Sequence, residues 1–269
     1  MTSTALVPPV PATGSAPRGR TGPLVAEWIK FRSVRSTWIL LAAVVVLLVA
    51  VPAFAAVGAV VGSTSGAGSG EMDVLSALLA GVNPVEFLVA ALGALAVTGE
   101  YSSGLIRVTL AAVPRRLPVL RAKVLVVGAV TLVTGLVAVS AAYLGVRLVL
   151  VAAHVPTVAA GPSAVFVTAL GTGAYLSGIA LIGMGFGWVV RSTVGSLASF
   201  FGLMYVPPLL ALVPGVAPVA PFLPSNAGGA LLRASVAEPA MAAVGGAAFA
   251  AWIAALLVVA ALVLRRRDA

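Results

Sequence analysis

The chain has 269 residues, of which 61% are hydrophobic and only 9% are charged. Soluble domains are about 45–50% apolar and about 25% charged, so this composition excludes an ordinary water-soluble globule. The formal net charge of +9 would suit nucleic acid. The cations lie at the ends of apolar runs, however, where lipid headgroups and topology explain them, so we expect no nucleic-acid partner. The absence of cysteine excludes disulfides and thiolate metal sites.

The N-terminal region divides into a polar tail and an amphipathic segment. Residues 1–22 are rich in proline, serine, threonine and glycine, which predicts a disordered tail. In residues 23–36, Glu27 and Lys30 lie on one helical face. The apolar residues of another face are Leu24, Val25, Trp28, Ile29 and Phe31. This pattern predicts a helix that lies in the inner membrane interface, with a plain extension of the first span as the alternative.

Six apolar runs follow, and about 20 apolar residues are needed to cross the hydrocarbon core of a bilayer. We therefore predict an all-α membrane protein whose single six-span domain covers residues 23–267. The expected spans are 37–61, 84–98, 124–150, 163–190, 194–213 and 241–264.

The cationic residues are distributed unevenly along this layout. Fourteen of the sixteen lysines and arginines fall in segments that share one side of the membrane, and only Arg147 and Arg233 fall on the other. Cytoplasmic loops are the ones enriched in lysine and arginine. We therefore expect a multi-pass protein of the cell membrane with both termini cytoplasmic.

The second span begins with the pattern of a helix start. Asn83 suits the cap, Pro84 the first helical position, and Glu86 can reach back to the cap. A span from Pro84 to Thr98 is only about 22 Å long, so its outer end is shallow or residues 75–81 add a short re-entrant piece. An acidic group at membrane depth is also a candidate functional site, so Glu86 is open to both interpretations.

Small residues mark the fourth span. Gly183 and Gly187 form a G-x-x-x-G pair, which lets helix backbones approach closely inside a membrane. Glycine enrichment from the base composition of the gene is the alternative. Outside the spans, the proline-rich but apolar residues 214–239 predict short helices packed against the outer end of the bundle.

The motifs of enzymes are missing from the sequence. A P-loop needs G-x-x-x-x-G-K-[ST], and neither of the two lysines follows that pattern. His154 has no acidic or histidine neighbour at ligand spacing, so we expect no metal site. We predict that the chain is not an enzyme and holds no cofactor of its own.

The segment from Gly99 to Lys123 is the longest expected cytoplasmic interruption between spans. It carries five cations and one acid. Glu100 and Arg107 are seven positions apart, so they share a face if the stretch is one helix. A segment of this length suits docking to a soluble partner, and a basic loop that only faces lipid is the alternative.

Three stretches resemble the permease subunits of type-two ABC exporters. They are residues 26–38 (AEWIKFRSVRSTW), residues 99–110 (GEYSSGLIRVTL) with Pro114, Arg115, Arg116 and Lys123, and, more weakly, residues 221–228. The resemblance implies an elbow helix at 23–36, a coupling helix after Gly99 and a re-entrant outer element at 214–239. It also implies pairing with a second permease half, homo- or heterodimeric, and docking to a separate ATP-binding subunit that holds ATP and magnesium.

From this resemblance we expect a permease that exports a drug-like, lipidic or peptide substrate. Glu100, Tyr101, Gly104 and Arg107 are then the residues expected to couple it to the ATPase. The short outer loops depart from family members that carry large extracellular domains. A stand-alone secondary transporter or channel, and a membrane sensor or scaffold without transport, are the alternatives.

Overall fold

The computed structural model describes residues 22–64, 72–106, 109, 116–154, 157–158, 161–210, 217–234 and 239–266. The first half contains α1 (Gly22–Ser33), α2 (Arg35–Thr64), α3 (Val74–Ala80), the 3₁₀ turn η1 (Asn83–Val85), α4 (Glu86–Ser102) and α6 (Arg116–Ala152). The second half contains α7 (Pro162–Val190), α8 (Thr193–Leu210), η2 (Ala217–Phe222), α9 (Pro224–Leu232) and α10 (Pro239–Arg266). A two-residue parallel pairing joins β1 (Met72–Asp73) to β2 (Thr157–Val158).

Five of the described segments are long and apolar enough to cross a membrane. They are Arg35–Gly62, Val74–Ser102, Arg116–Ala152, Pro162–Val190 and Ala240–Arg266. The architecture is therefore all-helical apart from the small strand pair, and it is consistent with a multi-pass membrane protein. The sixth expected span, 194–213, corresponds to α8, which is shorter and contains Pro207 and Pro208. Its last three expected residues lie outside the described part of the chain, and its membrane crossing stays a prediction.

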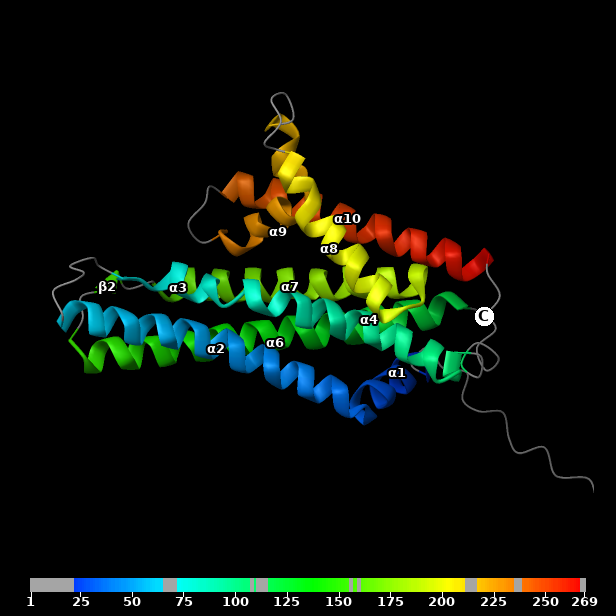
Figure 1. The fold of residues 1–269 in the computed structure, drawn as a ribbon, viewed down its shortest axis with the longest axis horizontal. Helices are drawn as coiled ribbons and strands as arrows, with labels where there is room; N and C mark the ends of the chain where they lie inside the picture. The colour runs from blue at the N-terminus through cyan, green and yellow to red at the C-terminus, as the bar shows by residue number, and fades with distance from the viewer. Residues whose placement is uncertain are drawn as a thin grey trace, which may run out of the picture.

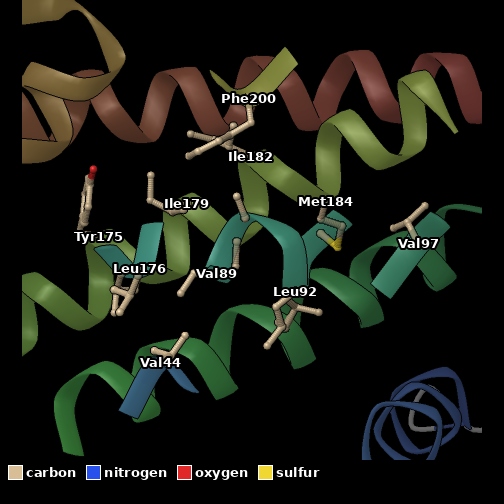
Figure 2. Packing of buried hydrophobic residues seen from close by; sticks show 14 of the residues in the cluster. Val44, Val89, Leu92, Val97, Tyr175, Leu176, Ile179, Ile182, Met184 and Phe200 are labelled. Atoms are coloured by element: carbon tan, nitrogen blue, oxygen red, sulfur yellow. The ribbon is translucent and has the colours of Figure 1, made fainter. Parts of the chain in front are cut away.

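Helix α7 occupies the centre of the bundle. It packs against α4 and α6 along most of its length, and α8, α9 and α10 cover its other side (Figure 1). Figure 2 shows the resulting core, in which Ile179, Ile182 and Met184 of α7 lie among side chains from the neighbouring helices. Each of these three side chains is fully buried. A helix that is apolar on all sides is placed at the centre because every face can then be buried.

The second span is longer than its sequence pattern predicts. Helix α3 lies in line with α4 rather than turning back, so the two helices and the short η1 between them form one apolar segment (Figure 1). Asn83 does not act as a cap: η1 begins after Val82 without a side-chain cap hydrogen bond. The short span and the re-entrant piece expected from Pro84 are therefore replaced by one broken but continuous apolar segment of membrane length.

Glycines allow α4 and α7 to touch through their backbones. A Cβ atom built on Gly183 would collide with the carbonyl oxygen of Ala90, and one on Gly93 would collide with that of Ala180. A Cβ on Gly187 would lie 3.2 Å from the carbonyl oxygen of Ala94. Gly183 and Gly187 thus lie in a close helix–helix contact, as their G-x-x-x-G spacing predicts.

Helix α1 and the end of α10 lie toward the same end of the bundle (Figure 1). Helix α1 is amphipathic, but it turns its charged face toward the bundle and much of its apolar face outward. Glu27 is buried against the bundle, whereas the apolar Val25, Trp28 and Ile29 are exposed. Phe31, expected on the apolar face, is buried beside Glu27. An outward apolar face is stable only in contact with lipid or another apolar surface, which agrees with the expected interfacial position.

Candidate functional site: an ionic cluster at one end of the bundle

Four charged side chains from three helices meet at the α1 end of the bundle. The ammonium group of Lys30 in α1 lies 3.0 Å from Glu27 Oε1 and 3.0 Å from Glu100 Oε1 in α4. Lys123 in α6 donates to the same Glu100 oxygen at 3.0 Å and also pairs with Glu27 Oε2. We call Glu27, Lys30, Glu100 and Lys123 the ionic cluster. Two negative and two positive charges make it neutral overall.

The ionic cluster is largely removed from solvent. The exposed fractions are 4% for Glu27, 8% for Glu100 and 4% for Lys123. Burying a charge is costly unless it is paired and hydrogen-bonded, and each of these groups has at least one opposite partner. Removing one member would strand the others, so the cluster is an interdependent unit that fixes α1, α4 and α6 relative to one another.

The partially exposed member of the ionic cluster, Lys30, is held in its charged form. Burial alone would lower the pKa of Lys30, but hydrogen bonds and electrostatic attraction to Glu27 and Glu100 outweigh it and raise the pKa above the ordinary value. Lys30 also donates to the hydroxyl of Thr109 at 3.0 Å. Thr109 belongs to the segment after α4, so Lys30 links α1 to that segment directly.

The structure describes three of the four residues expected to couple the chain to a partner, and these three have different surroundings. Glu100 belongs to the ionic cluster. Tyr101 contacts Trp188 of α7 edge-on, and the guanidinium of Arg191 lies 5.0 Å from its ring centre. Gly104 lies two residues beyond the end of α4 and has a φ of 73°, a conformation that glycine adopts without strain. Arg107 lies outside the described residues, so its expected pairing with Glu100 stays a prediction.

The segment between the second and third spans is shorter than expected. Gly99–Ser102 still belongs to α4, and α6 begins at Arg116 instead of at the expected residue 124. Arg116 donates to the carbonyl oxygen of Leu264 at 2.9 Å and so connects α6 to the end of α10. Cationic side chains commonly satisfy free carbonyls at a helix C-terminus, which explains this contact.

A second polar site lies within the bundle, around Glu86 at the start of α4. Tyr175 of α7 donates to Glu86 Oε1 at 2.7 Å, and Tyr205 of α8 donates to Glu86 Oε2 at 2.7 Å. The helix-cap interpretation of Glu86 is therefore wrong, because both oxygens accept from tyrosines of other helices. The carboxyl group connects α4, α7 and α8 at a single point.

Aromatic side chains surround the open side of the Glu86 site. Phe87 stacks on Tyr205, and Phe201 stacks on both of them, with ring centres 5.1–6.0 Å apart. All three rings are exposed, with Phe201 half exposed. We call Phe87, Phe201 and Tyr205 the aromatic face. Large exposed aromatic patches mark surfaces that contact lipid, ligand or another protein.

Within the segment 214–239, for which the sequence predicts short helices, the described residues 217–234 form η2 and α9, which pack on the bundle. A Cβ atom on Gly228 of α9 would lie 2.5 Å from the ring of Tyr175, so α9 presses directly on a tyrosine of the Glu86 site. Trp252 of α10 donates to the carbonyl oxygen of Phe222 at 2.9 Å, which holds η2 in place. The position of Tyr175 is thus fixed from the side on which α9 lies.

Sequence patterns did not identify the residues that bind Glu100 and Glu86. Lys30 and Lys123 are the only lysines in a chain with fourteen arginines, and both are found in the ionic cluster. A compact ammonium group with three donors fits between two carboxylates, so this rare residue type is a signal that could have indicated them. Tyr175 and Tyr205 carry no comparable signal, because tyrosine also packs as an ordinary aromatic.

No arrangement for holding a metal ion is found among the described residues, where no three histidine or acidic side chains gather. Comparison with known proteins adds no identification. No protein-family model matches the chain, and no curated protein matches it either.

Proposed function

We propose that this chain is the membrane-spanning subunit of an ABC exporter, working with a second permease half and a separate P-loop ATPase. The observation that carries the proposal is the bridging position of Glu100. Its carboxylate connects Lys30 in α1 and Lys123 in α6 at the point where α4 ends and the proposed coupling segment begins. A force applied to that segment would move three helices together, which is what a coupling element requires.

The contact between Lys30 and Thr109 supports the same mechanism. Thr109 belongs to the proposed coupling segment, and Lys30 holds it to the proposed elbow helix α1 through a 3.0 Å hydrogen bond. In this mechanism ATP binding and hydrolysis in the partner shift the segment. The ionic cluster passes the shift to α1, α4 and α6, and the permease alternates between two access states. The chain itself supplies no catalytic group.

The aromatic face supports pairing with a second permease half. It joins α4 and α8, which are also linked by a 2.7 Å hydrogen bond between Thr98 and Thr193. We assign this face to the boundary between the two halves, where a drug-like, lipidic or peptide substrate would pass. Stacked, exposed rings offer contact area to an apolar substrate at low entropy cost. The orientation proposed for the assembly places both termini in the cytoplasm of the cell.

Affinity purification in mild detergent, with mass-spectrometric identification of the accompanying chains, tests the proposal. We expect a P-loop ATPase and a permease half, which is a second copy or a related chain. The complex should hydrolyse ATP, and Arg107→Ala should weaken docking or stimulation of the ATPase while Arg121→Ala, an exposed change on α6, should not. A purified chain that hydrolyses ATP alone would contradict the proposed division of labour.

A secondary transporter is the second candidate, because an acidic group held by two tyrosines at membrane depth suits proton coupling. Transport into vesicles distinguishes the two functions. The exporter requires ATP and its partner, whereas a proton-coupled transporter responds to a pH gradient without either and loses that response in Glu86→Gln.

A further inference from the structure

A groove of about 590 Å³ lies between η2, α9 and the start of α10. Its volume falls in the range of about 300–1,000 Å³ that is typical of small-molecule sites. The lining is apolar apart from Asn226 and Arg233, and half of its residues are alanine or glycine. Met241 and Val244 of α10, which also line the groove, are exposed. An apolar groove that contains one cation suits an amphiphile with an anionic group.

Arg233 is the cation of the groove. Three lining residues of α9, namely Asn226, Ala230 and Arg233, follow one another at intervals of four and three, so they share one helical face. A Cβ atom built on Gly229 would lie 3.5 Å from Arg233 Nη2, which places the guanidinium alongside α9. No acid of the described residues pairs with it, and Glu238, the nearest acid in the sequence, lies outside them. The planar fork of a guanidinium matches the oxygens of a phosphate.

The position of the groove along α10 indicates its depth in a membrane. Helix α10 is one of the described segments of membrane length, and Arg265 and Arg266 occupy its last turn. The hydrocarbon core of a bilayer is about 30 Å thick, which is the length of about 20 helical residues. Counted back from Arg265, this length ends at Gly245, which lines the groove. The groove therefore lies where acyl chains meet headgroups, in the leaflet opposite Arg265.

Helix α9 brings Arg233 to the headgroup side of the groove. It lies beside the first half of α10 (Figure 1). A Cβ atom on Gly228 would lie 3.1 Å from the ring of Phe249, and one on Gly246 would lie 2.9 Å from Leu231 Cδ2. As α9 proceeds, its partners in α10 thus come closer to the start of that helix. Arg233, two residues after Leu231, is therefore nearer the membrane surface, where the phosphates of lipids are the anions at hand.

We propose that the groove binds a phospholipid of the surrounding bilayer, with its phosphate at Arg233. The guanidinium donates N–H bonds to the phosphate oxygens, and one acyl chain lies along the small and apolar residues of α9 and α10. Diacylglycerol with the same acyl chains fits the apolar part but has no phosphate, so it gains nothing from Arg233. This site needs only that α10 spans the membrane, and it does not depend on whether the chain works as an ABC permease.

Photo-labelling of the purified full chain in bilayer nanodiscs tests the proposal. Phosphatidylglycerol with a photoactivatable acyl chain is crosslinked to the protein, and the labelled peptides are identified by mass spectrometry. Labelling of residues 239–246 is divided by labelling around Phe54 of α2. Phe54 is 80% exposed and lies about 28 Å along α2 from Arg35, so it samples lipid at a similar depth. We expect this ratio to fall about fivefold in Arg233→Gln, the effect of one arginine near a membrane surface.

Matched variants and a matched lipid show whether the phosphate causes the effect. Arg147→Gln removes an exposed cation of α6 that is expected on the same side of the membrane, and it should leave the ratio unchanged. Arg233→Lys keeps the charge without the planar fork and should retain part of the ratio. Photoactivatable diacylglycerol should label residues 239–246 equally in the wild type and in Arg233→Gln. An unchanged phosphatidylglycerol ratio in Arg233→Gln, or an equal fall with diacylglycerol or in Arg147→Gln, would overturn the proposal.

Discussion

Lys123 and Glu100 form a 3.0 Å ion pair between α6 and α4, and both side chains are buried. The two residues are only 23 positions apart, yet they belong to different membrane-length helices. Glu27 and Lys30 of α1 close the arrangement from a third side. The four residues of the ionic cluster together connect the N-terminal helix α1 to the bundle. Substitutions in the cluster therefore measure what this connection contributes to stability.

Glu100→Gln should destabilise the isolated chain. The substitution removes one of two carboxylates and leaves two lysines facing a single acid, and breaking a buried ion pair in this way costs about 3–5 kcal/mol. Thermal unfolding in detergent measures the effect, with Arg121→Gln on the exposed side of α6 as the control. An unfolding temperature equal to that of the control would show that the ionic cluster does not stabilise the fold.

The raised pKa of Lys30 predicts a stability loss at high pH. Because the folded-state pKa lies above the ordinary value of 10.5, the stabilisation is fully present below 10.5 and is lost as the pH rises through the folded-state pKa. Lys30→Arg keeps the charge and does not titrate in this range, so it should extend stability to higher pH. Unfolding temperature against pH measures this, and identical alkaline profiles for wild type and Lys30→Arg would refute it.

The two tyrosines bound to Glu86 should differ in importance. Tyr175 is 3% exposed and Tyr205 is 37% exposed. Tyr175→Phe leaves a buried carboxyl oxygen without a donor, at a cost of about 1–3 kcal/mol, whereas Tyr205→Phe removes a donor on the more exposed side of the site and should cost less. Chemical or thermal unfolding of both variants measures the difference. A larger loss of stability in Tyr205→Phe than in Tyr175→Phe would contradict this prediction. It would mean that the bond from α8 holds Glu86 more strongly than the exposure of Tyr205 indicates.

The contact between α4 and α7 should not tolerate a methyl group. Gly183→Ala forces the backbones apart at Ala90, and overpacking of this kind costs about 1–3 kcal/mol. Gly58→Ala is the matched control: it is the same change in an apolar helix, with nothing within 4 Å of the new Cβ, and it should be neutral or slightly stabilising. Equal unfolding temperatures for the two variants would argue against backbone contact at Gly183.

The charge distribution predicts that both termini are cytoplasmic. Reporter fusions after Ala67, Pro114 and Ala269 test this orientation. The fusion after Ala67 should report the outer side, and the other two should report the cytoplasm. Outer signals at both Pro114 and Ala269 would reverse the orientation. An outer signal at Ala269 alone would instead indicate an odd number of crossings, which is expected if α8 does not cross the membrane.

The sequence by itself determined the features that depend on local composition. Apolar runs of membrane length gave the helices, because an apolar stretch in lipid must satisfy its backbone hydrogen bonds internally. The G-x-x-x-G spacing of Gly183 and Gly187 indicated a close helix contact, because small side chains one turn apart share a face. The start of α1 and the short helices after residue 216 also followed from local pattern.

Only the tertiary structure decided which polar groups meet. The sequence predicted that Glu100 and Arg107 share a helical face, which the described residues do not test, whereas only the structure shows that Lys30 and Lys123 reach Glu100 from other helices. It also replaced the local capping role of Glu86 by bonds to Tyr175 and Tyr205. The rotation and register of each helix are set by packing against its neighbours. Contacts between residues far apart in the chain therefore cannot be read from spacing along one helix.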